Sequence, residues 1–252
     1  MSGRAGPALI AALWLALAGC DRDPAPVPAP SARPHPAVAA SAAPAPEPSE
    51  SPSAQPAAEP SVAAAQTYPP RNDCSTALGW PAFYKALTTA VRARDATGLA
   101  ALASPDITLD YGGGSGVEEL KKRLAEPERK LWAELDAIMP LGCAVQGGLA
   151  AMPWVFWNIP DDIDGYSAML VTGDAVELLD GPKGKPLAMV GWQLVGIDPM
   201  EFRPDKPTTK VTLRDARKGW IATARLRSLL DYRVIAEPKD NGWQITAFIA
   251  GD

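Results

Sequence analysis

The chain has 252 residues, a net charge of −5 and a pI of about 5.0. An acidic balance without a basic tract argues against nucleic acid as a partner. The one histidine, His35, lies in a Pro/Ala-rich stretch, so the rest of the sequence cannot build a Ser-His-Asp, Cys-His or usual zinc site. We therefore expect a protein that is not an enzyme and that needs no cofactor or metal.

The first residues carry a targeting signal. An apolar run, Ala8 to Ala18, follows Arg4 and has signal-peptide length, too short to span a bilayer. It ends in LAGC, Leu17 to Cys20, which resembles the lipobox of bacterial lipoproteins. The resemblance implies that residues 1–19 are a signal peptide and that an acylated Cys20 anchors the chain to a membrane. The alternative is an ordinary secretory signal.

Residues 20–69 are expected to be an acylated cysteine followed by a disordered linker. From Asp23 to Pro69 the sequence is almost entirely Pro, Ala, Ser and Glu. Such a composition buries too little apolar surface to offset its ordering entropy, and repeated proline favours an extended spacer. Asp21 follows the cysteine directly. In the enterobacterial lipoproteins that the motif resembles, an acidic residue there favours retention in the inner membrane, so the resemblance implies that location, with the folded head facing the periplasm.

Two further cysteines, Cys74 and Cys143, lie in the part expected to fold. In an oxidising compartment two remaining cysteines most often pair, so a Cys74–Cys143 disulfide is expected. Two buried thiols remain the alternative, because sequence gives no distance between the side chains.

Residues 70–165 read as a helical α+β domain. Apolar residues recur at a spacing of three and four over 80–103, which predicts a helix broken into two pieces by ARDAT, residues 93–97, and Gly98. Residues 104–112 alternate like a strand, and residues 117–139 predict a helix that is interrupted near Pro127.

Residues 166–252 contain short segments typical of strands, divided by Gly, Pro, Asp and Asn, with a hairpin turn at 239–242. Within them, 174–227 resembles the bacterial Src-homology-3 (SH3b) domain through Gly181-Pro182, the strand KVTL, and KGWIATARL at 218–226. The resemblance implies a small SH3-like β-barrel, followed by an extra C-terminal hairpin, with Trp220 packed in the barrel core. The predicted fold class is thus α+β.

The flanks carry a second resemblance. AVRARDATGLAALASPDITLDYG, residues 90–112, and DNGWQITAFIAGD, residues 240–252, resemble parts of nuclear-transport-factor-2-like (SnoaL-like) domains. Two arrangements stay open. In one, the barrel is inserted and the last hairpin returns to the helical part. In the other, a helical domain precedes a barrel that carries two extra strands.

The segment PWVFWNIPDDIDGY, residues 153–166, supplies the candidate binding residues. Trp154 and Trp157 form a possible aromatic platform beside Asp161 and Asp162. The alternative is that the aromatic side chains fill the interface between the two halves of the folded part, while the aspartates keep the loop soluble.

Together these features predict a membrane-anchored extracytoplasmic lipoprotein that acts as a non-catalytic binding module in the cell envelope. The SH3b resemblance implies peptidoglycan or an envelope protein as the partner. The alternative is a small-molecule-binding or carboxylate-based enzymatic head on the SnoaL-like half. A pocket lined by carboxylates beside the first helices would favour this alternative, and a groove near Trp154, Trp157 and Trp220 would favour the binding module.

Overall fold

The computed structural model describes residues 65–240 and 242–251, all of which belong to one compact unit of α+β structure. The predicted signal peptide, Cys20 and residues 20–64 of the predicted linker lie outside the described residues. Within the described part, no helix is both long and apolar enough to cross a membrane.

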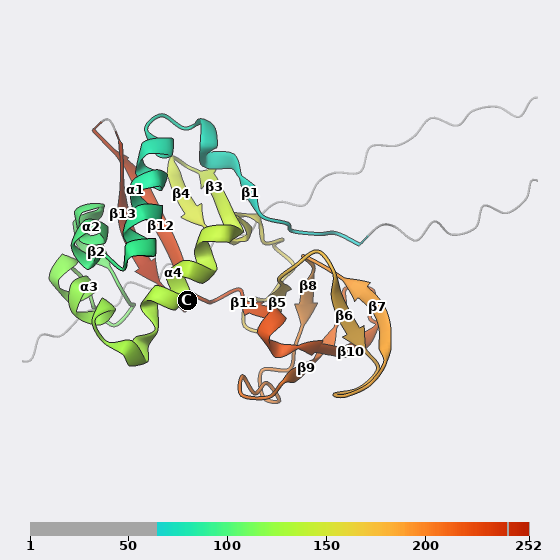
Figure 1. Ribbon diagram of the computed structural model, residues 1–252. Coiled ribbons are helices and arrows are strands. Elements are labelled where there is room, and N and C mark those ends of the chain that lie inside the picture. Colours follow the sequence, from blue (N-terminus) through green and yellow to red (C-terminus); the bar gives the residue numbers. More distant parts are fainter. Residues whose placement is uncertain (1–64, 241, 252) are drawn as a thin grey trace, which may run out of the picture. The chain divides into compact units, whose positions relative to one another are not determined.

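The first of two sheets has six strands (Figure 1). In spatial order they are β1 (Arg71–Asn72), β3 (Gly142–Gln146), β4 (Leu149–Met152), β12 (Arg233–Lys239), β13 (Gly242–Ile249) and β2 (Ala103–Thr108). The two outer pairs, β1–β3 and β13–β2, are parallel, and the other neighbours are antiparallel.

The helices come from the N-terminal half of the described chain. They are η1 (Asp73–Thr76), α1 (Trp80–Ala93), α2 (Ala96–Ala101), α3 (Val117–Leu124), η2 (Pro127–Arg129), α4 (Leu131–Ile138) and η3 (Met139–Leu141). The break predicted within residues 93–97 and the one predicted near Pro127 are confirmed, whereas Gly98 lies inside α2. Arg94 adopts a left-handed conformation and Asp95 caps α2 by accepting a hydrogen bond from the Gly98 N–H at 2.9 Å, while Pro127 begins the short turn between α3 and α4.

Buried side chains of the helices and the first sheet form one core. Trp80, Leu87, Leu120, Leu135 and Ile138 come from the helices and are at most 1% exposed. They pack with Cys143, Met152, Val234, Ile245 and Phe248 of the sheet. Their three- and four-residue spacing within the helices is the pattern that made these segments predictable.

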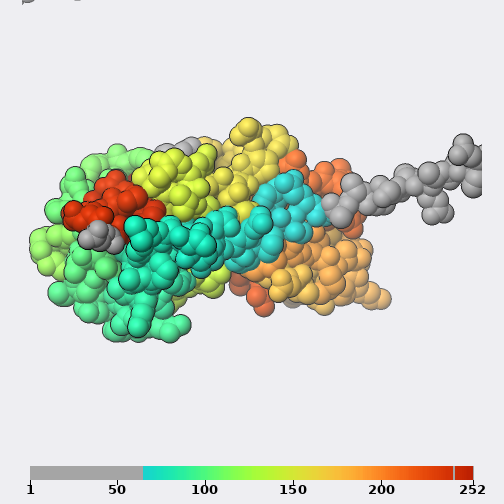
Figure 2. Space-filling model, turned by 90° about the horizontal axis from the view of Figure 1, so that it is seen from above, coloured from blue at the N-terminus to red at the C-terminus, as the bar shows by residue number. Residues whose placement is uncertain are grey.

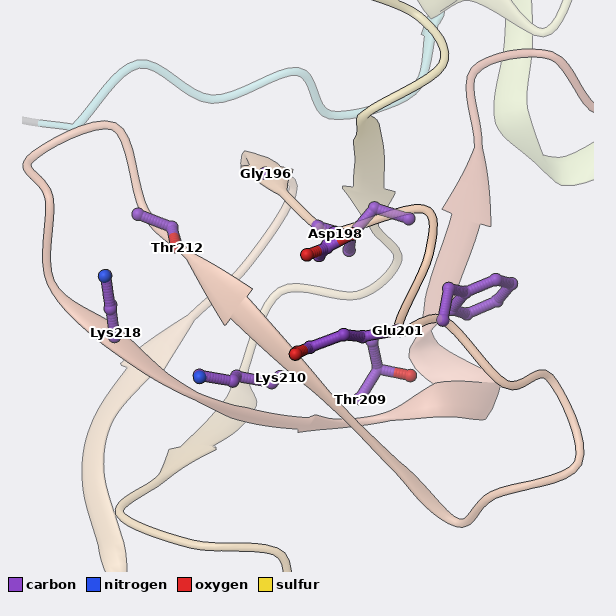
Figure 3. Close-up of a pocket in the computed structure, with 9 residues that line it drawn as sticks. Gly196, Asp198, Glu201, Thr209, Lys210, Thr212 and Lys218 are labelled. Atoms are coloured by element: carbon purple, nitrogen blue, oxygen red, sulfur yellow. The ribbon is translucent and has the colours of Figure 1, made fainter.

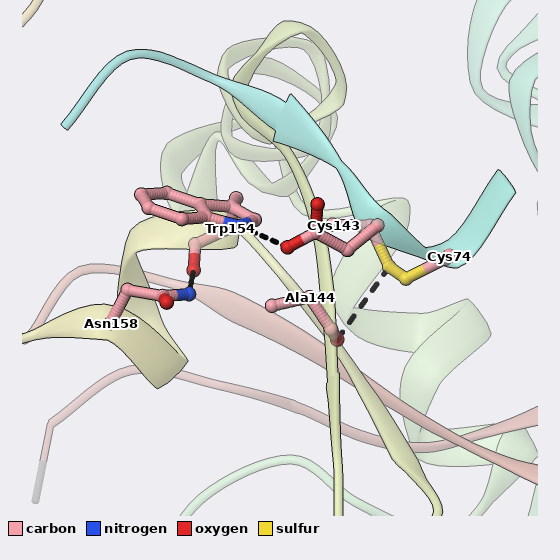
Figure 4. The surroundings of a disulfide bond; sticks show 6 residues. Cys74, Cys143, Ala144, Trp154 and Asn158 are labelled. Atoms are coloured by element: carbon pink, nitrogen blue, oxygen red, sulfur yellow. Dashed lines mark hydrogen bonds between the residues drawn. A yellow bond between two sulfur atoms is a disulfide. The ribbon is translucent and has the colours of Figure 1, made fainter.

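A disulfide ties this core to the start of the described chain. Cys74 and Cys143 are bonded across 69 residues of sequence, with a Cα–Cα distance of 5.8 Å, so the predicted bridge is confirmed (Figure 4). It lies beside the parallel pairing of β1 with β3, where Asn72 is the register partner of Cys143. In the chain-entropy model, closing a loop of this length stabilises the fold by about 4 kcal/mol.

The C-terminal hairpin belongs to the first sheet. Val234, Ile235 and Ala236 of β12 pair with Met152, Ala151 and Ala150 of β4. The predicted boundary that grouped residues 166–252 in one domain is therefore corrected: residues 153–232 are an inserted segment between two neighbouring strands. Sequence left both arrangements open because the apolar faces of β12 and β13 can cover either sheet.

The second sheet is formed by the inserted segment. Its order is β11 (Leu226–Ser228), β5 (Ala168–Val171), β8 (Leu194–Gly196), β9 (Thr208–Thr212), β10 (Lys218–Ala222), β6 (Val176–Leu179) and β7 (Pro186–Val190). Two short turns, η4 (Trp154–Asn158) and η5 (Thr223–Arg225), precede β5 and β11. All its pairings are antiparallel, and no closed barrel is found among the described strands.

The core of the second sheet is aliphatic. The prediction that Trp220 fills it is wrong: Gly219 and Ile221 point inward, and Trp220 is half-buried outside the core. Gly219 lets Leu178 approach, because a Cβ there would lie 2.6 Å from Leu178 Cδ1. The alternation of a strand gives two possible inward faces, and the size of Trp220 pointed to the wrong one.

A third cluster joins the two sheets. Its buried members are Tyr68, Ala144, Trp154, Val155, Ala168, Leu170, Leu194 and Leu229. The Tyr68 N–H donates to the carbonyl of Trp192 at 2.6 Å, a few residues before β1 joins the first sheet. In Figure 2 the cyan start of the described chain lies beside the orange atoms of the inserted segment.

The reassigned core of the second sheet gives a stability prediction. Ile221→Ala should lower the free energy of unfolding by about 2–5 kcal/mol, because Ile221 is 0% exposed. Trp220→Ala should cost less, since its side chain lies outside the core cluster. Chemical denaturation of the two variants and the wild type measures both values. A larger loss for Trp220→Ala than for Ile221→Ala would contradict the placement of the core.

Candidate functional site

A cavity of about 550 Å³ lies where the first sheet's helices meet the inserted segment. One wall comes from α4 and η3, and the other from the turn after β5, from η5 and from β11. Its chemistry-bearing residues are Glu134, Trp192, Arg225, Arg227 and Asp231. The volume falls in the range of about 300–1,000 Å³ that is typical of small-molecule sites.

Arg227 is the buried charge of this cavity. It lies in β11 opposite Leu170 of β5 and is 9% exposed. Its Nη2 donates to the carbonyl of Tyr232 at 2.7 Å. None of the ion pairs within the described part includes Arg227. Burial lowers the pKa of its guanidinium, against the opposing influence of Asp231 and Glu134, so the fold disfavours this charge.

Two carboxylates line the same cavity as Arg227 without forming an ion pair with it. Burial raises the pKa of Glu134, the charge of Asp231 raises it further, and Arg227 and Lys130 act in the opposite direction. Asp231 has a structural role as well, because its Oδ2 accepts a hydrogen bond from the Ser228 N–H at 3.1 Å. The charges of Arg227, Glu134 and Asp231 are thus close enough to influence one another.

Trp192 adds an aromatic wall held in an unfavourable backbone conformation. Its φ is +49°, in the left-handed region that bulky residues avoid. Three hydrogen bonds hold it: its N–H donates to Gly173 O, its carbonyl accepts from Tyr68, and its Nε1 donates to Asp174 Oδ1 at 2.8 Å. Such locally strained residues concentrate at functional sites, which makes Trp192 a second, independent marker of the cavity.

The two predicted binding tryptophans lie in the third cluster. Trp154 is 6% exposed and its Nε1 donates to Asp73 Oδ2 at 2.6 Å, while its carbonyl accepts from Asn158 (Figure 4). Trp157 is partly buried, packs against Phe156 with ring centroids 4.7 Å apart, and has a buried Nε1 without a hydrogen-bond partner. This geometry matches the interface-filling alternative, and a binding role for the two residues stays a prediction.

The two predicted binding aspartates are exposed. Asp162 forms an ion pair with Arg214 at 2.7 Å, and this hydrogen bond lowers its pKa. Asp162 and Arg214 line a separate hollow of about 310 Å³ beside β8. Asp161 does not line the junction cavity either. The structure therefore does not bring the four predicted residues together with Arg227 and Trp192, and their binding role remains a prediction.

The second sheet has a smaller groove of about 240 Å³. Lys210 and Lys218 lie on one side of it and Asp198 and Glu201 on the other (Figure 3). All four side chains are exposed, so water screens their charges and no conformation is imposed on a ligand. The groove is a weaker candidate than the junction cavity for this reason. Within the described residues, no group of His, Cys, Asp and Glu can hold a metal ion.

Sequence reasoning missed the junction cavity because its residues come from distant segments. Glu134, Trp192 and Arg227 are brought together only by the return of the C-terminal hairpin. No local pattern singles out Arg227: its strand, Leu226–Ser228, has the sequence LRS, and a second arginine, Arg225, lies two residues earlier.

No family model and no curated protein matches the chain. Among solved structures, a designed protein of the nuclear-transport-factor-2-like class is similar at 12% identity and a TM-score of 0.26. The match covers 68% of this chain and 95% of that one. A TM-score of this size carries no argument about fold or function, so the site has to be judged on its own geometry.

The raised pKa of Glu134 predicts a pH dependence of stability. The folded state holds this proton more tightly than the unfolded chain, so stability should fall as the pH rises from the unfolded pKa through the folded pKa. Glu134→Gln should remove this loss. The variant should therefore become more stable relative to the wild type as the pH rises from the unfolded pKa through the folded pKa of Glu134. Thermal melts between about pH 4 and pH 8 measure the difference.

Glu128→Gln is the matched control, because Glu128 is exposed and takes part in no ion pair within the described part. Its melting profile should follow that of the wild type. Identical profiles for Glu134→Gln and the wild type would contradict the assigned environment of Glu134.

Proposed function

We propose that this protein is a lipid-anchored ligand-binding module of the cell envelope, and that its junction cavity holds a small ligand with an anionic group. The head acts without catalysis, faces the periplasm, and is tied through an acylated Cys20 to the inner membrane. The anchor rests on the LAGC motif and the location on Asp21, both of which lie outside the described residues.

The observation that carries the binding proposal is the buried charge of Arg227, which no ion pair within the described part neutralises. Burying a guanidinium costs free energy, and burial lowers the pKa of Arg227 although the charges of Asp231 and Glu134 oppose this shift. A ligand carboxylate or phosphate in the cavity would neutralise that charge with bidentate hydrogen bonds. The fold thus keeps a costly group whose cost a bound anion removes.

A small ligand fits this geometry better than a cell-wall polymer or a protein surface. Two carboxylates line the cavity, Glu134 from α4 and Asp231 from the segment after β11, but the cavity does not lie at the first helices, where such a pocket was expected for the small-molecule alternative. Its volume and its buried arginine are what support a small ligand. Trp154 is buried, and Trp220 lines neither the cavity nor the groove of the second sheet. Peptidoglycan or an envelope protein remains the partner that the SH3b resemblance implies, and the groove at Lys210 and Lys218 is where such a contact would be sought.

The proposal also assigns a family resemblance to each of the two parts of the fold. The order of β6 to β11 and the Gly-Trp-Ile strand support an SH3b-like module in the inserted segment. The helices α1 to α4 on a sheet that ends in the returning hairpin support a SnoaL-like outer domain. In this view the ligand site lies at the junction of the two modules.

The binding proposal predicts a selective loss of ligand. The full-length chain is dialysed to equilibrium against the low-molecular-weight fraction of an envelope extract, and retained compounds are identified by mass spectrometry. Wild type should retain at least one anionic compound. Arg227→Met should reduce its retention about tenfold or more, because a charge-assisted hydrogen bond of about 1.5–3 kcal/mol is lost.

Lys210→Met is the matched control, since Lys210 is also cationic but lines the groove of the second sheet instead. It should retain the compound as the wild type does. Retention that depends on Lys210 and not on Arg227 would move the site to the groove. No retained compound, or equal retention by all three proteins, would refute the proposal.

A further inference from the structure

We infer that the junction cavity recognises a zwitterion, namely an α-amino acid with an apolar side chain. This inference rests on the proposed binding function and specifies its ligand class. It comes from the arrangement of one buried cation, Arg227, one exposed cation, Arg225, two acidic side chains and an apolar wall around a single cavity. No ion pair joins the charged residues of opposite sign, so each remains available to a ligand group.

The carboxylate end of the ligand is assigned to Arg227. Its guanidinium has five N–H donors, and the contact with Tyr232 O occupies one of them. Burial in β11 fixes its position, because the side chain is only 9% exposed. A planar fork of this kind binds a carboxylate through two parallel hydrogen bonds.

The ammonium end is assigned to Glu134, with Asp231 beside it. Both line the cavity, and both lie within electrostatic reach of Arg227. Asp231 already accepts a hydrogen bond from the Ser228 N–H, whereas no hydrogen bond or ion pair within the described part engages the Glu134 carboxylate. A ligand carrying only an anion would satisfy Arg227 but bring a second negative charge close to these two acids. A zwitterion avoids that repulsion.

The side chain of the ligand has an apolar wall available. Leu141, Ala137 and Pro140 line the cavity from α4 and η3, and Leu226 and Trp192 line it from the inserted segment. A volume of about 550 Å³ leaves room for a large side chain, including an aromatic ring that stacks on Trp192.

Three probes with the same side chain test the contribution of each ligand charge. Phenylalanine carries both the carboxylate and the ammonium group, N-acetylphenylalanine carries only the carboxylate, and phenylalaninamide carries only the ammonium group. Calorimetric titration of the full-length chain should give phenylalanine the tightest binding, by about tenfold or more over either analogue. Glu134→Gln should abolish its advantage over N-acetylphenylalanine. Arg227→Met should abolish its advantage over phenylalaninamide.

The outcomes separate this inference from the function it rests on. If N-acetylphenylalanine binds as tightly as phenylalanine and depends on Arg227, the zwitterion inference fails while anion binding in the cavity stands. If none of the probes binds, the amino-acid class is refuted, and retention from the envelope extract still decides the binding function separately. If phenylalanine still binds more tightly than both analogues in the Glu134→Gln and Arg227→Met variants, the inference is also refuted, because the difference in affinity would then come from contacts other than those assigned.

Discussion

The antiparallel pairing of β4 with β12 is the constraint on which the rest of the structure depends. It places residues 152 and 234 side by side, although 81 residues separate them along the chain. Both ends of the inserted segment are thereby fixed to neighbouring strands of one sheet. The junction cavity is lined by α4 and η3 of the first part and by the turn after β5, η5 and β11 of the inserted segment, so it depends on how this pairing anchors the segment. The backbone hydrogen bond from Tyr68 to Trp192 is a second link between the start of the described chain and the inserted segment.

Two residues that line the cavity, Arg227 and Trp192, have features that are unfavourable for stability. Arg227 carries a buried charge without an ion-pair partner in the described part, and Trp192 adopts a left-handed backbone conformation. Replacing a buried charge by an apolar residue of similar volume is often neutral or stabilising. Both features line one cavity, and they support the proposal that this region binds a ligand.

Local sequence patterns made much of the part formed by the helices and the first sheet predictable. The spacing of apolar residues located α1 to α4 and their breaks, and two cysteines in a presumed oxidising compartment led to the bridge between Cys74 and Cys143. Period-two patterns were less informative. They located β10 but not its inward face, so Trp220 was assigned to a core that Ile221 occupies. Choosing a face requires knowing the neighbouring sheet, which is long-range information.

The candidate site was unpredictable for the same reason. Aromatic and acidic residues clustered in sequence at 154–162 attracted attention, but the structure buries Trp154 and pairs Asp162 with Arg214. Glu134, Trp192 and Arg227 are spread over 94 positions of sequence and converge only in the folded chain. Nothing in the local sequence around Arg227, which stands between Leu226 and Ser228, marked it as a cavity residue.

The free energy of unfolding of Arg227→Met, measured without ligand, tests the central claim most directly. If the charge of Arg227 is reserved for a ligand, removing it relieves a buried cation and costs one hydrogen bond to Tyr232 O. The free energy of unfolding of the variant should then be equal to or higher than that of the wild type, and any loss should be smaller than about 1 kcal/mol. A loss of about 3 kcal/mol or more would show instead that Arg227 is a structural residue, and would contradict the assignment of the cavity as a ligand site.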